Sequence, residues 1–289
     1  MGLFGPILAA TSLSPTSGAA LREAHALSVD LHTRLTVCHI LPEQYRARVL
    51  FPHEAGVDRT AHAALLERSE GAVRTEMRAA LGSAADQLPI EFDTGSPHAG
   101  ILAVARRVGA GLVVVGSGLT AQRVARAGDG LLLVARESPA GGAVLGATDF
   151  SDPSLPAIQM AAAEAVRRGA RLRLVHCLDV DSTAYLVPMG AVGLVGAAPF
   201  PESAVTQLEA DARTRLEAAA PEGAAAEALV LRLSPYRGIL QAAAEIPTSL
   251  IVVGTHGHSG LARLALGSVA ESVMRDAPCS VLVVPIQRD

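Results

Sequence analysis

The sequence contains no lysine and no tryptophan, and only 3% of its 289 residues are aromatic. All 24 basic residues are therefore arginines, which excludes chemistry that depends on a lysine amine, such as a P-loop lysine or a Schiff base. The net charge is −4 and no basic cluster occurs. Nucleic acid is thus not expected as a partner, because binding it requires clustered positive charge and usually stacking aromatics.

Cysteine is scarce as well, with only Cys38, Cys177 and Cys279 in the chain. Their odd number and the lack of any CxxC spacing favour free thiols in a reducing compartment and argue against a disulfide framework or a zinc site. The N-terminus lacks a basic leader and a long apolar core of the kind that signal peptides have. We therefore expect a cytoplasmic protein without a bound structural metal.

Long apolar runs are also missing, apart from the segment 185–200, YLVPMGAVGLVGAAPF. This segment is shorter than the roughly 17–25 residues of a spanning helix, and it contains glycine and proline. Membrane contact is the alternative interpretation, but a loop or a surface buried against a partner is favoured. No membrane insertion is expected.

The chain instead contains a repeat. Residues 96–116 align with residues 234–254 at a constant offset of 138, with ten of 21 positions identical. Upstream, ILAATSLS aligns with VLGATDFS at an offset of 137, which also places His39 over His176. Self-similarity at a fixed offset indicates two copies of one structural unit.

Within each copy, short β-branched runs alternate with longer amphipathic stretches, which is typical of a parallel sheet covered by helices on both faces. The fold predicted is α/β, with two tandem doubly wound, Rossmann-like sheets of five parallel strands. The glycine-rich stretch 138–143 marks a linker, so the domains predicted are 1–138 and 139–289. In the second copy we expect strands at 143–148, 171–178, 227–233, 249–254 and 280–285, and helices including 154–169 and 203–220.

Residues 254–268, GTHGHSGLARLALGS, follow a predicted strand and contain regularly spaced glycines. In a doubly wound sheet, ligands bind beyond the carboxyl ends of the strands. Gly254 and Gly257 have no Cβ, so their backbone can approach a bulky anion closely. Taken alone, the glycines also suit an ordinary tight turn, but their position after a strand favours phosphate binding.

A second anion-binding element is predicted where Gly267 is followed by Ser268 and Glu271. This pair has the spacing of a capping box, which predicts a helix from Val269 to just before Pro278. Unpaired N–H groups at a helix N-terminus hold phosphate without lysine. The alternative is an ordinary helix cap with no ligand.

The segment VVGTHGHSGLARLALGSVAESVMRDAPCSVLVVP resembles the signature of the universal stress protein family. ATP-binding members carry glycine, two residues, glycine, nine residues, glycine and then serine or threonine. Those positions fall on Gly254, Gly257, Gly267 and Ser268. The resemblance covers essentially the whole chain as a tandem of two domains, although only the second carries the motif. It implies the adenine nucleotide alpha hydrolase-like fold and ATP, with or without Mg²⁺, as the ligand.

The resemblance also assigns roles outside the glycine motif. Asp149, preceded by Thr148 in GATDFS, occupies the position of an aspartate that hydrogen-bonds the nucleoside. The alternative role for Asp149 is a turn residue before the next helix. The main chain of Cys177 is implied to contact adenine, and Val269 continues the phosphate-facing helix start.

Two histidines of the loop complete the candidate set. His256 agrees with the GxHG of the family, although a loop histidine also serves to orient a turn. His258 stands where many relatives carry an arginine beside the triphosphate. No third ligand lies nearby in the sequence, so a metal site is not predicted.

The first copy is predicted to lack a working site. Ser12 replaces the aspartate, and only 14 positions separate Gly116 from Gly130, whereas 26 separate Gly254 from the final strand at residue 280. We expect the last helix of this copy to be short or absent. Its predicted role is architectural, as an intramolecular partner of the second domain, and the chain is also compatible with a homodimer.

The leading hypothesis is a cytoplasmic stress-response protein that binds ATP in its second domain and acts by nucleotide occupancy, with at most slow hydrolysis. No lysine, paired carboxylates or activated nucleophile accompanies the glycines. The competing hypothesis is a scaffold of the same fold that binds no nucleotide and interacts through the strands LLLVA and SVLVVP. Adenylyl transfer is disfavoured, because neither first strand is followed by the glycine-serine-aspartate loop expected of such relatives.

Overall fold

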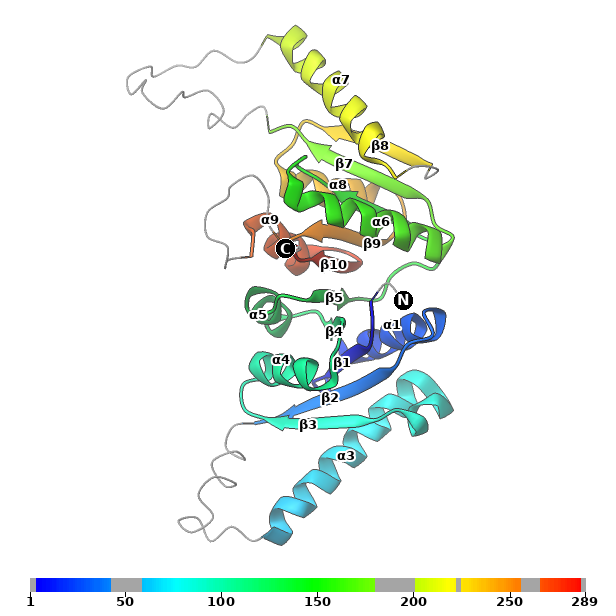
Figure 1. The fold of residues 1–289 in the computed structure, drawn as a ribbon, viewed down its shortest axis with the longest axis vertical. Helices are drawn as coiled ribbons and strands as arrows, with labels where there is room; N and C mark the ends of the chain where they lie inside the picture. The colour runs from blue at the N-terminus through cyan, green and yellow to red at the C-terminus, as the bar shows by residue number, and fades with distance from the viewer. Residues whose placement is uncertain (1–3, 43–58, 180–200, 222–224, 256–265, 287–289) are drawn as a thin grey trace, which may run out of the picture. The chain divides into compact units, whose positions relative to one another are not determined.

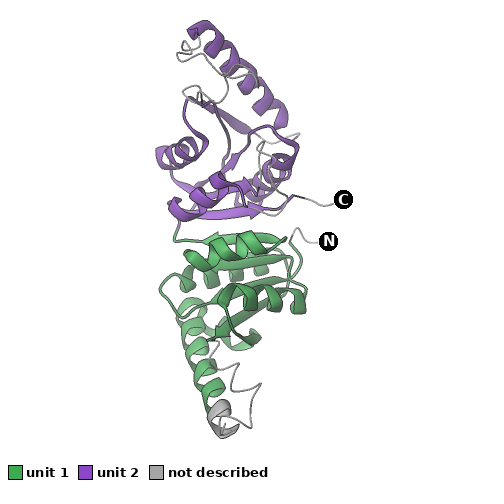
Figure 2. Ribbon diagram, turned by 90° about the vertical axis from the view of Figure 1, so that its left-hand side faces the viewer, with its two compact units in different colours: residues 1–137 green, residues 138–289 purple. Residues whose placement is uncertain are grey.

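Strands and helices alternate through the described parts of the chain, as the apolar pattern predicts (Figure 1). The computed structural model describes residues 4–42, 59–179, 201–221, 225–255 and 266–286. The chain divides into two units, residues 1–137 and 138–289 (Figure 2). Within each unit the strands pair in parallel.

In the second unit the strand order is β8-β7-β6-β9-β10. The chain steps outward from β6 to β8 and then returns to the other side of β6. Because parallel crossovers are right-handed, this reversal puts α6 and α7 on one face of the sheet and α8 and α9 on the other. The elements are β6 (Ala143–Ala147), η2 (Asp152–Ser154), α6 (Leu155–Arg168), β7 (Leu172–Cys177), α7 (Glu202–Ala219), β8 (Ala226–Leu231), α8 (Pro235–Glu245), β9 (Thr248–Gly254), α9 (Ser268–Asp276) and β10 (Ser280–Val284).

The first unit repeats this topology with the order β3-β2-β1-β4-β5. Its elements are β1 (Ile7–Thr11), α1 (Ser17–Asp30), β2 (Leu35–Leu41), α3 (Arg59–Leu81), η1 (Gly82–Gln87), β3 (Ile90–Thr94), α4 (Pro97–Val108), β4 (Leu112–Gly116), α5 (Leu119–Ala127) and β5 (Leu131–Ala135). The predicted fold class is thereby confirmed. The seven elements predicted for the second copy are confirmed as well, each to within two residues at either end.

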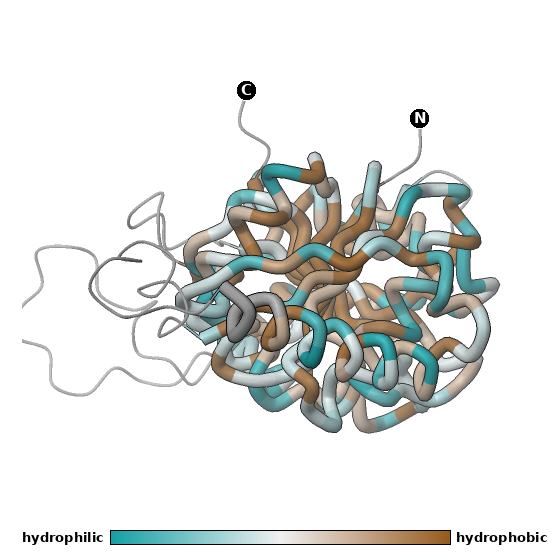
Figure 3. Tube along the Cα trace, turned by 90° about the horizontal axis from the view of Figure 1, so that it is seen from below, coloured by the Kyte–Doolittle hydropathy of each residue, from teal (hydrophilic) through white to brown (hydrophobic). Residues whose placement is uncertain are grey.

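The inner strands are buried on both faces, which explains why they read as continuous apolar runs, whereas the outer strands β3 and β8 contain no buried residue. All five residues of β1 and of β10 are buried, as parallel sheets between two helical layers require. In Figure 3 the apolar, brown segments gather in the middle of the view and hydrophilic segments lie around them. Among the described residues, none of the helices is both long and apolar enough to cross a membrane.

The duplication extends to individual side chains. His39 Nδ1 donates to the carbonyl oxygen of Thr11 at 2.9 Å, and His176 Nδ1 donates to that of Thr148 at the same distance. In both units this bond joins the carboxyl end of the second strand to that of the first. The histidine at this position is therefore part of the frame of the unit.

The prediction that the last helix of the first copy is short or absent is wrong. α5 contains nine residues, as many as α9. It begins three residues after Gly116, the last residue of β4, whereas α9 begins fourteen residues after Gly254. The shorter sequence removes loop rather than helix, and α5 still packs against β5 and α4.

Candidate functional site

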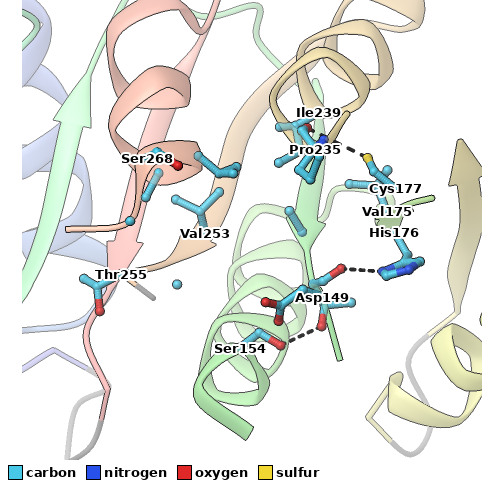
Figure 4. Close-up of a pocket in the computed structure, with 16 residues that line it drawn as sticks. Asp149, Ser154, Val175, His176, Cys177, Pro235, Ile239, Val253, Thr255 and Ser268 are labelled. Carbon is cyan, nitrogen blue, oxygen red and sulfur yellow. Dashed lines mark hydrogen bonds between the residues drawn. The ribbon is translucent and has the colours of Figure 1, made fainter. Parts of the chain in front are cut away.

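A cavity of about 190 Å³ opens at the carboxyl end of the second sheet, beside the reversal between β6 and β9 (Figure 4). Ligands of doubly wound folds bind at this topological position. The cavity is lined by the ends of β6, β7 and β9 and by the first turns of α8 and α9. Its lining residues are Ala147, Thr148, Asp149, Ser154, Val175, His176, Cys177, Pro235, Ile239, Val253, Gly254, Thr255, Gly267, Ser268, Val269 and Ala270.

The glycine motif enters this cavity from the β9 side. Gly254 ends β9, and the amide of the following Thr255 donates to Val284 of β10 at 3.0 Å. The Gly267 N–H donates to the Thr255 carbonyl at 2.7 Å. Both ends of the intervening segment are therefore joined directly beside the cavity. His256, Gly257 and His258 lie outside the described residues, as does the apolar segment 185–200.

The first turn of α9 supplies hydrogen-bond donors to the cavity. The predicted capping box is wrong in detail: Gly267 is the N-cap, Ser268 is already the first helical residue, and the cap contains no side-chain hydrogen bond. Glu271 is the first residue whose amide bonds back, to the Gly267 carbonyl at 3.0 Å. The amides of Ser268, Val269 and Ala270 thus have no acceptor within the helix. All three residues line the cavity.

The turn after β6 holds Asp149 at the opposite wall. Thr148 is buried, and its hydroxyl accepts from the Phe150 amide at 2.9 Å and pairs with the Ser154 hydroxyl at 2.7 Å. Oδ1 of the half-buried Asp149 accepts from the Ser151 amide at 3.0 Å and from the Ser151 hydroxyl. Asp149 therefore does have the turn-forming role considered as the alternative. The same carboxylate lines the cavity, so the two roles are compatible.

The main-chain groups and the thiol of Cys177 point in different directions, and the thiol lies 3.8 Å from the Pro235 carbonyl oxygen of α8. The next amide, that of Leu178, donates to Leu231 on the β8 side at 2.8 Å. Peptide groups of alternate strand residues face opposite neighbours, so those of Cys177 face β6, where the cavity lies. Burial, with a smaller contribution from the charge of Asp179, raises the pKa of the Cys177 thiol to about 12. The thiol is thus neutral at pH 7 and is a poor nucleophile.

An apolar wall of the cavity was not predicted from the sequence. Pro235 and Ile239 of α8 form this wall together with Val175 and Cys177 of β7 (Figure 4). α8 approaches β7 closely at Gly238, because a Cβ there would lie 2.3 Å from the Cys177 sulfur. The repeated SPxxGIL motif contained this signal, since its glycine and proline both serve the approach, but periodicity alone does not show which strand the helix touches.

The equivalent edge of the first unit is built differently. Ser12 occupies the place of Asp149, and its hydroxyl lies 2.9 Å from that of Ser14 and 3.2 Å from that of Ser17. A Cβ on Gly116 would lie 2.7 Å from the Thr16 hydroxyl oxygen. The first unit thus places the Thr16 hydroxyl against the end of β4, at the position where the second unit has its cavity.

A metal centre finds no support among the described residues, where no three histidine, cysteine or acidic side chains come together. None of the three cysteines forms a disulfide.

The comparisons with known proteins agree on one family. A family model described as the universal stress protein family matches the chain twice, at residues 4–127 and 142–285. A universal stress protein of Thermus aquaticus is 39% identical over 142 residues, which are 49% of this chain and 96% of that protein. The universal stress protein YxiE of Bacillus subtilis is 32% identical over 149 residues, covering 49% of this chain and 97% of the relative. These relatives thus correspond to one half of the chain.

Solved structures match the full length. A universal stress protein from Archaeoglobus fulgidus aligns with a TM-score of 0.66 over 98% of this chain and 97% of its own, at 20% identity. A protein described as a putative universal stress protein from Pseudomonas aeruginosa aligns with a TM-score of 0.61 at 17% identity and covers 98% and 94%. At such identities the likeness establishes the fold alone.

Proposed function

The chain belongs to the universal stress protein family, with one family domain in each half, and on this basis we propose that its second domain binds ATP. The bound nucleotide acts by occupancy, and the protein works in the cytoplasm as a stress-response module. The first domain carries no nucleotide, and its role is architectural. Mg²⁺ accompanies the phosphates if it is present.

The observation that supports this proposal most strongly is the grouping of three complementary elements around one cavity. The amides of the first turn of α9, which have no acceptor within the helix, suit phosphate oxygens, since a helix N-terminus carries partial positive charge. The carboxylate of Asp149 suits the hydroxyls of a sugar. The wall formed by Val175, Ile239 and the main chain of Cys177 suits the flat base. These residues are up to about 120 positions apart in the sequence, and only the fold brings them together.

Occupancy is favoured over turnover because the described cavity residues offer little acid–base chemistry. The titratable side chains among them are Asp149, His176 and Cys177. Asp149 accepts hydrogen bonds within its own turn, and His176 donates to a main-chain carbonyl. The Cys177 thiol is held neutral by burial, which raises its pKa to about 12. The hydroxyl that donates to Asp149 belongs to Ser151, which is not among the cavity-lining residues, so none of the three is arranged as a base beside a nucleophile of the cavity.

The proposal predicts one ATP per chain. Isothermal titration of the full chain with ATP should give a stoichiometry near one, because Asp149 and the long glycine loop occur in the second unit while Ser12 and a short connection replace them in the first. Two equivalent sites would contradict the assignment of the first domain as nucleotide-free. GTP competing as well as ATP would remove the preference for adenine.

Ser268→Pro tests the phosphate role of α9. Proline is well tolerated as the first helical residue, and the preceding residue must then be extended. Gly267 already has φ −61° and ψ 142°, so the fold should accept the change without a loss in Tm. The variant lacks one amide donor and one hydroxyl, and we expect ATP affinity to fall about tenfold, since one or two hydrogen bonds to a charged group are lost.

Adenosine serves as the control ligand for this variant, because it has no phosphates. Its affinity should be the same for Ser268→Pro and the parent. An equal loss for both ligands would indicate a general distortion of the cavity, and unchanged ATP binding would show that this helix turn does not hold phosphate.

The competing function is a scaffold that binds no nucleotide. The first unit supports it in part, since the same fold persists there with Ser12 in place of the aspartate. Purified chain without co-eluting nucleotide in mass spectrometry, together with no heat on ATP titration, would favour the scaffold.

A further inference from the structure

Phe150, directly after Asp149, has an unusual backbone. Its φ is +64°, and a bulky residue with an L side chain rarely adopts such a value. A conformation of this kind persists only where the surroundings hold it in place, and it is often associated with a functional site. Because Phe150 follows Asp149 immediately, whatever fixes the Phe150 backbone also fixes the direction of the Asp149 carboxylate.

Three side chains meet at this point, one from the turn after β6, one from β7 and one from α7. The ring of Phe150 lies against the His176 imidazole with centroids 4.2 Å apart and a tilt of 32°. The guanidinium of Arg215, on α7, lies 4.1 Å from the centroid of the Phe150 ring. We refer to these three residues as the Arg215–Phe150–His176 stack. His176 also donates to the Thr148 carbonyl. The stack therefore contacts the residue before Asp149 and the residue after it.

The first unit provides an internal control for this feature. Leu13 has φ +57°, and its amide donates to the Thr11 hydroxyl at 3.1 Å, as the Phe150 amide does to Thr148. Leu13 is nevertheless 41% exposed, and His39 meets Phe92 edge-on at 6.3 Å instead. The turn therefore belongs to the fold, whereas among the described residues the stack occurs only in the unit that carries Asp149 and the glycine motif.

The corresponding helices α3 and α7 also carry different side chains at this point of the two units. Glu76 on α3 lies between the buried Val73 and Met77, as Arg215 on α7 lies between the buried Ala212 and Leu216. The Glu76 carboxylate accepts a hydrogen bond from the Thr11 hydroxyl. The unit with a serine at the aspartate position thus has an acid on this helix, and the unit with the aspartate has an arginine over an aromatic ring.

We infer that the Arg215–Phe150–His176 stack positions Asp149 for the nucleotide and thereby makes nucleotide affinity depend on α7. The inference rests on the proposed function. Aromatic pairing and a cation over a ring each contribute modestly, but both act on the one turn that carries the carboxylate. Phe150, His176 and Arg215 are positioning residues in this arrangement.

Two variants test the stack by ATP titration of the full chain. Phe150→Leu copies the residue that the same turn accepts in the first unit, so folding should survive, and Kd for ATP should rise about tenfold. Arg215→Met keeps the length of an exposed side chain and removes its charge, with an expected rise of about threefold. Leu13→Phe, the matched change in the first unit, should leave the affinity unaltered.

A double-mutant cycle separates positioning from general stability. In an Asp149→Ala background, Phe150→Leu should change Kd by less than about twofold, because the carboxylate that the stack positions is no longer there. Parent-like affinity in both single variants, or the same tenfold loss in the Asp149→Ala background, would overturn the inference while leaving nucleotide binding intact. A parent chain that does not bind ATP would overturn the proposed function, and the inference with it.

Discussion

Asp149→Ala is expected to weaken ATP binding by about 10- to 150-fold, which corresponds to about 1.5–3 kcal/mol for hydrogen bonds to a charged group. The carboxylate lines the cavity and is fixed by the turn that follows β6. The substitution also removes the acceptor for the Ser151 amide, so a stability loss of about 0.5–1.5 kcal/mol accompanies it. Calorimetric titration and thermal unfolding of the same sample separate the two effects.

Two controls sharpen this prediction. Asp149→Asn retains an oxygen acceptor for the Ser151 amide, so its Tm should be close to the parent value and its ATP affinity should lie between those of parent and Asp149→Ala. Dideoxy-ATP lacks the sugar hydroxyls, and its weaker binding should not depend on residue 149. If ATP and dideoxy-ATP lost equal affinity in Asp149→Ala, the carboxylate would not act on the sugar.

Gly238→Ala is expected to have the largest effect on stability. The added Cβ would lie 2.3 Å from the Cys177 sulfur, and the short cysteine side chain, whose thiol lies 3.8 Å from the Pro235 carbonyl, has little room to move. Overpacking of this kind costs about 1–3 kcal/mol. To relieve this contact α8 must move away from β7, which separates the two sides of the apolar cavity wall. ATP affinity should therefore fall together with the Tm.

A second substitution should reverse this effect. In Gly238→Ala combined with Cys177→Ala the sulfur is gone, and the new Cβ meets the Cβ of residue 177 at 3.6 Å, an ordinary contact. Most of the lost stability should return. Gly100→Ala is the matched change in the first unit, where the Cβ would meet the longer Ile40 side chain at 2.9 Å. It should lower stability less and leave ATP affinity unchanged, and failure of the double variant to recover would exclude the steric explanation.

Asp149 and the three cavity-lining residues of the glycine motif illustrate how far sequence reasoning reaches. Gly254, Gly267 and Ser268 lie at one cavity with Asp149 although they are more than a hundred residues away from it. Their convergence was expected because the carboxyl ends of parallel strands lie at one edge of the sheet. The local prediction at Ser268 was wrong, since the Gly267–Thr255 hydrogen bond places the N-cap one residue earlier than the capping-box spacing indicates.

The sequence by itself determined the two units, the order of their strands and helices along the chain, and the edge of the second sheet at which the cavity lies. These follow from the period of the apolar residues and from the repeat, both of which are local properties of the chain. Only the tertiary structure decided that α8 closes on Cys177 at Gly238 and that Arg215 of α7 lies over Phe150. Contacts of this kind depend on the distance between two packed elements and on which rotamers fill it, and neither quantity has a signature in the spacing of residues along one chain.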